Sequence, residues 1–180
     1  MKLEVPYKIV DKVSQDLIDE TLSLIDVNHW LLDNTRSLMG NLENTQTIFV
    51  RYFDDYRNNK SEFWKDHIVN HSLFDRYSVV TEKFLKKLNK HYNISNYICF
   101  FAKLSAHSNV GLHGDGGPFL EQCHRIHIPI KTNKDVFYII ENKKYNWTVG
   151  NIYEFDNTRI HGVLNNSDED RIHLMFNIYE

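Results

Sequence analysis

The sequence has few of the features that mark disulfide-stapled, membrane-spanning or repetitive proteins. Only two of its 180 residues are cysteines, Cys99 and Cys123, which fits a reducing compartment and provides no disulfide framework. No apolar run approaches the roughly 20 residues of a membrane-spanning helix. The first residues, MKLEVPYKIVDKVSQ, lack the basic-then-apolar layout of a signal peptide. These absences predict a cytoplasmic protein without a membrane partner.

The chain also lacks a large excess of positive or negative charge. The formal net charge is only −3, so there is no electrostatic reason to expect nucleic acid or an anionic membrane as a partner. No repeat, low-complexity segment or proline-rich linker divides the chain. Its length predicts one domain, 1–180, with enough residues to bury a core. The oligomeric state stays open.

The part of the chain before residue 95 shows helical periodicity. Segment 14–26 is expected to be a helix capped by Ser14. Its apolar face comprises Leu17, Ile18, Leu22 and Ile25. A second helix is predicted over 73–92. Between them, 45–53 has the pattern of a strand, and 54–71 is expected to be a loop with one short helix. We expect region 1–95 to be helical support and a lid.

After residue 95 the chain becomes a series of short apolar runs separated by turn residues, which is typical of a β-barrel or sandwich. The predicted strands are 97–105, 124–131, 135–141, 151–155, 159–164 and 171–179. Region 96–180 is therefore expected to form a mainly β barrel that the N-terminal helices support.

Three residues of this region can together bind a metal. His113 and Asp115 lie two positions apart in GLHGDGGP, and His161 follows Asp115 after 45 intervening residues on a predicted strand. Residues i and i+2 of an extended segment point to the same side, so the first two can converge. Two imidazoles and one carboxylate form the facial triad of non-haem Fe(II) sites, which leaves positions open for other ligands. The surrounding glycines are expected to permit positive φ and to give a substrate room.

Arg171 follows His161 by ten residues and opens the last predicted strand. Its planar guanidinium suits the far carboxylate of 2-oxoglutarate, a co-substrate that chelates iron and supports O2 activation. The alternative is a surface ion pair with Asp168 or Glu169. Strand alternation places Arg171 on the polar face of 171–179, with the apolar residues on the other face.

The motifs together resemble the aspartyl/asparaginyl β-hydroxylase family of Fe(II)/2-oxoglutarate oxygenases. The resemblance covers about 97–179 and includes RIHIPI, VGNIYEFDN, RIHGVLNN and DRIHL. It implies a double-stranded β-helix, or jelly roll, and a cofactor-binding role for Arg125 and His127 beside Arg171. Because Asp115 is present, the chain is more similar to bacterial members that keep His-x-Asp…His, such as proline cis-4-hydroxylases, than to animal members that lack the acidic ligand.

The resemblance implies hydroxylation of an aliphatic C–H bond in an amino acid, with release of succinate and CO2. The substrate is expected to be a free, proline-like amino acid or an Asp/Asn-like residue of a peptide or protein. The alternative is a cupin-like metal-binding protein without oxygenase activity, a sensor or an isomerase. For Arg51, entry into the pocket and a surface ion pair remain equally open. His107 is expected to be solvated, and Asp156, Asn157 and Asn165 to shape turns.

Overall fold

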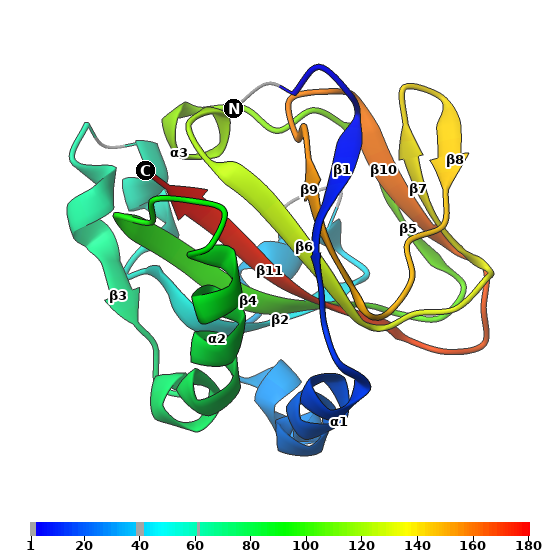
Figure 1. Cartoon of the computed structure of the whole chain (residues 1–180), viewed down its shortest axis with the longest axis horizontal. Coiled ribbons are helices and arrows are strands. Elements are labelled where there is room, and N and C mark those ends of the chain that lie inside the picture. The colour runs from blue at the N-terminus through cyan, green and yellow to red at the C-terminus, as the bar shows by residue number, and fades with distance from the viewer. Residues whose placement is uncertain (1–2, 39–41, 61) are drawn as a thin grey trace.

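The computed structural model describes residues 3–38, 42–60 and 62–180 and arranges them as two facing β-sheets with helices on one side (Figure 1). The larger sheet has seven strands in the order β1-β9-β6-β11-β4-β2-β3, and the smaller has four in the order β5-β10-β7-β8. Neighbouring strands pair antiparallel in both sheets. The predicted mainly β, jelly-roll architecture with supporting helices is confirmed.

The elements have the following bounds. The strands are β1 (Tyr7–Lys12), β2 (Thr45–Phe53), β3 (Ile68–Asn70), β4 (Asn96–Leu104), β5 (Ser108–His113), β6 (His124–Lys131), β7 (Val136–Ile140), β8 (Lys143–Tyr145), β9 (Asn151–Phe155), β10 (His161–Asn165) and β11 (Arg171–Tyr179). The α-helices are α1 (Gln15–Leu24), α2 (Phe74–Leu88) and α3 (Pro118–Glu121). Short 3-10 helices are η1 (Val27–Leu31), η2 (Arg36–Leu38), η4 (Tyr56–Lys60) and η5 (Trp64–His67).

Several elements were not predicted from the sequence. Besides β2, which was predicted, the first 95 residues supply β1 and β3 to the large sheet, so this region is more than helical support. In β1 the buried and exposed positions do not alternate, and β3 has only three residues, so neither has a clear strand pattern. Strand β8 follows a tight turn in which Glu141 and Asn142 adopt positive φ. Its sequence, KKY, has no apolar alternation.

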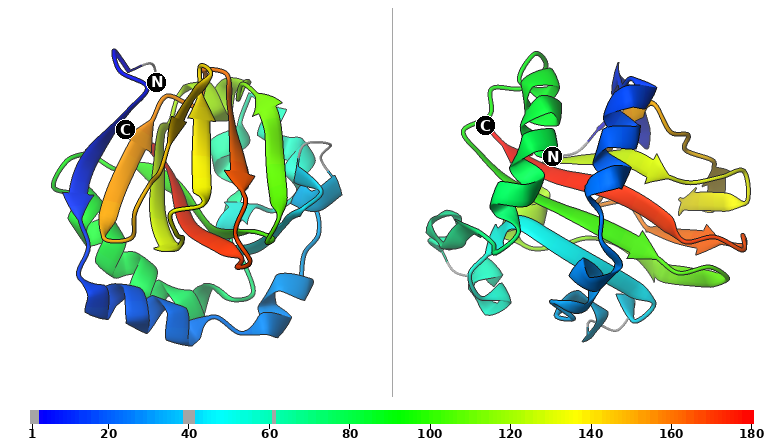
Figure 2. Two further views of the ribbon diagram at one scale, coloured as in Figure 1. Left: turned by 90° about the vertical axis from the view of Figure 1, so that its right-hand side faces the viewer. Right: turned by 90° about the horizontal axis from the view of Figure 1, so that it is seen from below.

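Helices α1 and α2 cover the outer face of the large sheet (Figures 1 and 2). Val80, Phe84 and Leu88 of α2 are fully buried against this face, as their spacing of four predicts. Ser14 precedes α1 in an extended conformation, but its side chain makes no capping hydrogen bond. None of the described helices has the length and apolar character needed to cross a membrane.

Strand β11 is central to the large sheet and has its two faces in different environments. It pairs with β4 on one side and β6 on the other. Ile172, Leu174, Phe176 and Ile178 pack into the core beneath the helices. The intervening residues, which begin with Arg171, face the space between the two sheets. The alternation predicted for this strand therefore determines which side chains reach the interior of the barrel.

Candidate metal centre and cofactor cavity

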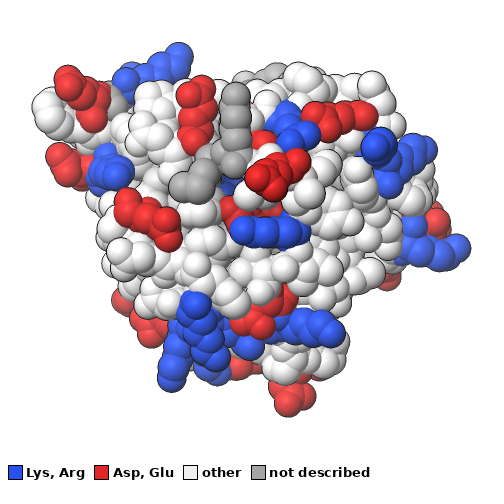
Figure 3. Space-filling view, turned by 45° about the horizontal axis from the view of Figure 1, so that its top comes forward, with Lys and Arg blue, Asp and Glu red and all other residues white. Residues whose placement is uncertain are grey.

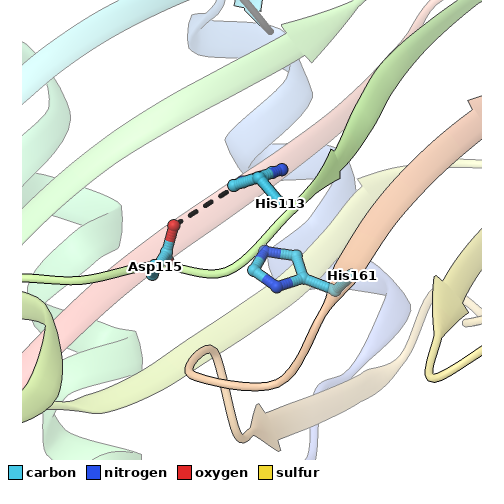
Figure 4. A group of neighbouring side chains, drawn as sticks. All are labelled: His113, Asp115 and His161. Carbon is cyan, nitrogen blue, oxygen red and sulfur yellow. Dashed lines mark ion pairs between the residues drawn. The ribbon is translucent and has the colours of Figure 1, made fainter.

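His113, Asp115 and His161 lie together at one end of the small sheet (Figure 4). His113 is the last residue of β5 and His161 the first of β10, and the two are aligned partners in the ladder. Asp115 lies in the loop just past β5. One ligand atom from each residue lies within 4.8 Å of the other two. The three residues singled out by their spacing thus form one cluster of possible metal ligands.

Both imidazoles are oriented by the backbone. His113 Nδ1 lies 2.8 Å from the carbonyl oxygen of Gly111, and His161 Nδ1 lies 2.8 Å from that of Arg159. A carbonyl only accepts, so each Nδ1 carries a proton, and in the neutral form of each ring Nε2 is the nitrogen with the lone pair. Burial lowers the pKa of His161, which favours the neutral ring that a metal needs.

Asp115 is fixed by Asn157. The backbone N–H of Asp115 donates to the carbonyl of Asn157 at 2.9 Å, and the Asn157 side-chain amide donates to Asp115 Oδ2 at 3.2 Å. Asp115 Oδ1 lies 3.6 Å from His113 Nε2. One carboxylate oxygen is therefore held by the protein while the other faces the histidine cluster.

Two glycines of this loop, Gly114 and Gly117, occupy positions where a side chain would clash or would be strained. Gly117 has φ +95° where the chain turns into α3, so the expectation of positive φ is confirmed there. At Gly114 a Cβ would come within 3.2 Å of the Thr158 carbonyl. The absent side chain at this position allows the two ligand-bearing loops to pack together.

A cavity of about 440 Å³ lies between the sheets beside this cluster. This volume is within the range of small-molecule sites, roughly 300–1,000 Å³. Its lining includes all six residues predicted for metal and cofactor binding. They are His113, Asp115, Arg125, His127, His161 and Arg171.

Arg171 lies at the deep end of the cavity and is 4% exposed. Its Nη2 donates to the hydroxyl of Tyr138. The alternative ion pairs are wrong, because Asp168 contacts His107 and Glu169 contacts Lys131. Arg171 is thus a buried cation that faces the cavity.

Arg125 and His127 lie on β6, the strand beside β11, where they are opposite Asn177 and Met175. Arg125 donates through Nη1 to Asn177, its cross-strand partner on β11. His127 Nδ1 lies 2.9 Å from the hydroxyl of Tyr138. Burial, followed by the charge of Arg125, moves the pKa of His127 well below its usual value, so its ring is neutral at physiological pH.

The chemistry of the cavity fits iron and 2-oxoglutarate. The two histidines and one carboxylate are the donor set of non-haem Fe(II). Several buried side-chain nitrogens of the inner face have no hydrogen-bond partner within the described part of the chain. They are Arg125 Nε, His127 Nε2, Arg171 Nε, His173 Nε2 and Asn177 Nδ2. Buried polar atoms normally find partners, and these donors match an acceptor-rich ligand such as a dicarboxylate.

The structure also tests the sequence expectations for Arg51, His107, Asp156 and Asn165. Arg51 is not among the cavity residues; its guanidinium donates to Asn70 and Asn96, so neither of its two interpretations holds. His107 is exposed, as expected, and contacts Asp168 at 2.8 Å. Asp156 and Asn165 accept backbone N–H groups two residues ahead, as their turn role predicts.

The sequence did not identify three residues of the site. Tyr138 lies on the inner face of β7 and resembles an ordinary core aromatic, while Asn157 was assigned to a turn. Arg36, on η2, lines the cavity from the N-terminal part of the chain. No motif or spacing marks Tyr138 or Arg36, and only tertiary packing brings them to the cavity. Asn157 ends the VGNIYEFDN motif, but nothing in the motif indicates that its side chain contacts Asp115.

Comparison with solved structures supports the architecture. The viral collagen prolyl hydroxylase vCPH from Paramecium Bursaria Chlorella virus-1, in its 2OG complex, has 14% identity and a TM-score of 0.52 over 97% of this chain and 96% of that one. A 2OG-Fe(II) oxygenase family oxidoreductase from Burkholderia pseudomallei has 10% identity and a TM-score of 0.54 over 74% of this chain and 65% of that one. At these identities the likeness shows a shared fold.

The sequence comparison identifies the family. No curated protein matches the chain. The model of the aspartyl/asparaginyl β-hydroxylase family matches residues 33–180, which include η2, every strand except β1 and all the cavity residues named above. The chain therefore belongs to the aspartyl/asparaginyl β-hydroxylase family of 2-oxoglutarate-dependent oxygenases.

Proposed function

We propose that the protein hydroxylates an aliphatic C–H bond of an amino-acid substrate, free or within a peptide, and uses Fe(II), 2-oxoglutarate and O2. The observation that carries the proposal is the arrangement of one cavity, which has the His113, Asp115 and His161 cluster on its wall and Arg171 at its deep end. A metal site and a buried cation facing the same enclosed space suit a chelating dicarboxylate.

In this proposal His113, Asp115 and His161 hold iron through two Nε2 atoms and one carboxylate oxygen. With both bound, the iron and its co-substrate would supply oxidative decarboxylation of 2-oxoglutarate to succinate and CO2, with one atom of O2 entering succinate and the other entering the hydroxylated substrate. The protein's own residues hold the neutral tautomer of both rings and the orientation of the carboxylate.

Arg171 binds the far carboxylate of 2-oxoglutarate, assisted by Tyr138. Burial raises the pKa of Tyr138 to about 12, so its hydroxyl remains protonated and can donate to a carboxylate. His127 and Arg125 lie nearer the metal cluster along the inner face and provide further donors to the co-substrate.

Aromatic side chains pack around the cavity. Tyr138 stacks on Trp147 with ring centroids 3.8 Å apart, and Phe155 lies against His161 at 5.0 Å. This apolar packing lowers the local dielectric and so strengthens each charge-assisted hydrogen bond to the bound acids.

The substrate class follows from the family name and from one relative. The family is described by aspartyl and asparaginyl hydroxylation, and the viral neighbour is a collagen prolyl hydroxylase. Both descriptions name amino-acid residues. We extend that chemistry to this chain as a free or peptidyl amino acid.

The test is substrate-dependent succinate formation with Fe(II), ascorbate and 2-oxoglutarate, together with mass-spectrometric detection of a product that has gained one oxygen atom. Amino acids and peptides form the panel. His161→Ala and Arg171→Ala are expected to abolish succinate formation, while His91→Ala, at an exposed position, leaves it unchanged. If the wild type neither binds 2-oxoglutarate nor makes succinate, the proposal fails.

The same assay separates the oxygenase from a cupin-like sensor or isomerase. A metal module without oxygenase activity has no need of a buried arginine facing its metal. If the protein is such a module, Arg171→Ala would leave metal binding unchanged. Calorimetric titration with 2-oxoglutarate would then give no heat with the wild type or with Arg171→Ala.

A further inference from the structure

His173 is a fully buried histidine to which the proposed function gives no role. It lies on the inner face of β11 between Arg171 and Met175, which both line the cavity, but His173 itself is not a lining residue. The surface offers no comparable signal, since positive and negative side chains are interspersed on the face in Figure 3. Burial of a polar group costs free energy unless the group is hydrogen-bonded, so the partners of His173 are informative.

His173 belongs to a cluster around the hydroxyl of Tyr138. Three groups reach this oxygen, namely Arg171 through Nη2, His127 Nδ1 at 2.9 Å and His173 Nδ1 at 3.3 Å. Arg171 can only donate, because a guanidinium has no acceptor. The hydroxyl has one hydrogen to donate and two lone pairs that accept. Burial raises the pKa of Tyr138 to about 12, so this hydrogen is present at neutral pH.

These numbers of donors and acceptors determine the tautomers of the two histidines. Burial moves the pKa of His127 and of His173 well below the usual value, so each ring is neutral and carries one hydrogen. When all three hydrogen bonds are made, the oxygen accepts from Arg171 and from one imidazole, and the hydroxyl donates to the other imidazole. One Nδ1 atom therefore donates and the other accepts.

Three observations make His173 the donor. Its Nε2 has no hydrogen-bond partner within the described ranges, and a ligand in the cavity does not contact it, so the ring hydrogen is better placed at Nδ1. His127 Nε2 also has no partner there, but His127 lines the cavity, where a bound acid can accept its hydrogen. The shorter distance, from Tyr138 to His127, suits the hydroxyl as donor, because O–H donors form shorter hydrogen bonds than N–H donors.

We infer that His173 is a positioning residue, which donates its Nδ1–H to the Tyr138 oxygen and so directs the hydroxyl hydrogen toward the cavity. There the hydrogen is available to His127 Nδ1, which leaves His127 Nε2–H as a donor, or to a carboxylate bound beside Arg171. An acceptor in the place of His173 would take this hydrogen away from the cavity. The inference rests on the proposed function, because the bound acid is the 2-oxoglutarate of that proposal.

Nitrogen-15 NMR of the imidazole side chains measures the tautomers. The Zn(II)-loaded protein is used, because Zn(II) is diamagnetic and binds histidine and carboxylate ligands. The signals are assigned with His173→Phe and His127→Phe. We expect His173 to be protonated at Nδ1 only and His127 at Nε2 only. The reverse pair of tautomers, or a positively charged His173, would overturn the inference.

Calorimetric titration of 2-oxoglutarate into the Mn(II)-loaded proteins measures the consequence for binding. His173→Phe keeps a buried ring but removes the donor, whereas His173→Asn keeps an amide N–H near the position of Nδ1 and leaves a cavity. We expect Kd to rise about 2- to 12-fold in His173→Phe, which is the effect of losing one neutral hydrogen bond. In His173→Asn the change should be less than about twofold, although its Tm is the lower of the two. His107→Asn, at an exposed position, is the control and should bind as the wild type does.

A merely structural role predicts the opposite order, in which the less stable variant also binds 2-oxoglutarate more weakly. That order, or a Kd for His173→Phe equal to that of the wild type, overturns the inference. A wild type that does not bind 2-oxoglutarate contradicts the proposed function instead. The NMR result needs no co-substrate, so it still decides whether His173 donates to Tyr138.

Discussion

The side-chain amide of Asn157 donates to Asp115 Oδ2 at 3.2 Å and to the carbonyl of Leu120 at 3.1 Å. Asn157 is fully buried, and its backbone carbonyl accepts the N–H of Asp115. One residue thus fixes both the backbone and the carboxylate of a proposed metal ligand, and at the same time ties the ligand loop to α3.

We expect Asn157→Ala to weaken metal binding about 10- to 100-fold, because groups that hydrogen-bond a metal ligand typically contribute this much. Titration of the apoprotein with Co(II), followed by its visible absorption, measures the change. Asn109→Ala, an exposed position on the same strand as His113, is the control and should bind as the wild type does. Equal affinities of the wild type and Asn157→Ala would contradict the positioning role.

The hydroxyl of Tyr138 joins Arg171 to His127. Tyr138→Phe keeps the ring and its stacking on Trp147 but removes this link and one donor to the co-substrate. We expect a rise in KM for 2-oxoglutarate of about 10- to 140-fold, since a hydrogen bond to a charged group contributes about 1.5–3 kcal/mol. Steady-state succinate assays measure it, with the half-exposed Tyr145→Phe as the control. A KM equal to that of the wild type would remove Tyr138 from the co-substrate site.

Phe84 anchors α2 to the outer face of the large sheet and is fully buried. Phe84→Ala should reduce the free energy of unfolding by about 3–5 kcal/mol, because it leaves a cavity in a packed core. At about 2–4 °C per kcal/mol for a chain of this size, Tm should fall by roughly 6–20 °C. Differential scanning calorimetry measures the shift. The exposed Val79→Ala on the same helix should change Tm little.

The sequence predicts best those elements whose apolar residues follow a clear hydrophobic pattern and pack against the core along the whole element. Helix α2 is of this kind, since its buried residues repeat at the helical period, whereas strands β2, β6, β9 and β11 are runs of strand-forming residues that are buried almost throughout. Strand β1 lies at the edge of the large sheet and its burial is irregular. Strand β8 pairs with β7 after a turn in which Glu141 and Asn142 have positive φ. Tertiary pairing determines both, so their local sequence carries little signal.

The same distinction applies to the site. His113, Asp115 and His161 could be singled out because their chemistry is specific and strand geometry brings them together. The alternation of β11 predicts that Arg171 lies on the cavity side, while the role of Arg125 and His127 is implied by the family resemblance. Arg36 lies on a 3-10 helix of three residues, which is too short to show a hydrophobic period in the sequence. Tyr138 lies among apolar residues of β7, so its sequence context is that of an ordinary core residue. Their contribution depends on how distant segments pack.

Glu154 is a buried carboxylate on β9 with three partners. Its oxygens contact His124 Nδ1 at 2.6 Å, the Tyr92 hydroxyl at 2.8 Å and Lys8 Nζ at 2.8 Å. Burial alone would raise the pKa of Glu154, but hydrogen bonds from His124, Lys8 and Tyr92 outweigh it and lower the pKa from 4.5 to about 2. The ionised form is therefore the one that the fold stabilises.

A carboxyl with a lowered pKa in the folded state stabilises the fold fully above its unfolded value, and this stability is lost as the pH falls from 4.5 toward 2. We expect Glu154→Gln to lose about 3–4 kcal/mol at pH 7, since the pKa falls from 4.5 to about 2, one pKa unit corresponds to about 1.4 kcal/mol, and the partners are left incompletely paired. The difference from the wild type should shrink as the pH approaches 2. Urea unfolding between pH 7 and pH 3 measures both effects, with Glu20→Gln, which breaks the exposed pair with Lys83, as the control. A destabilisation that does not depend on pH would show that Glu154 acts through packing alone.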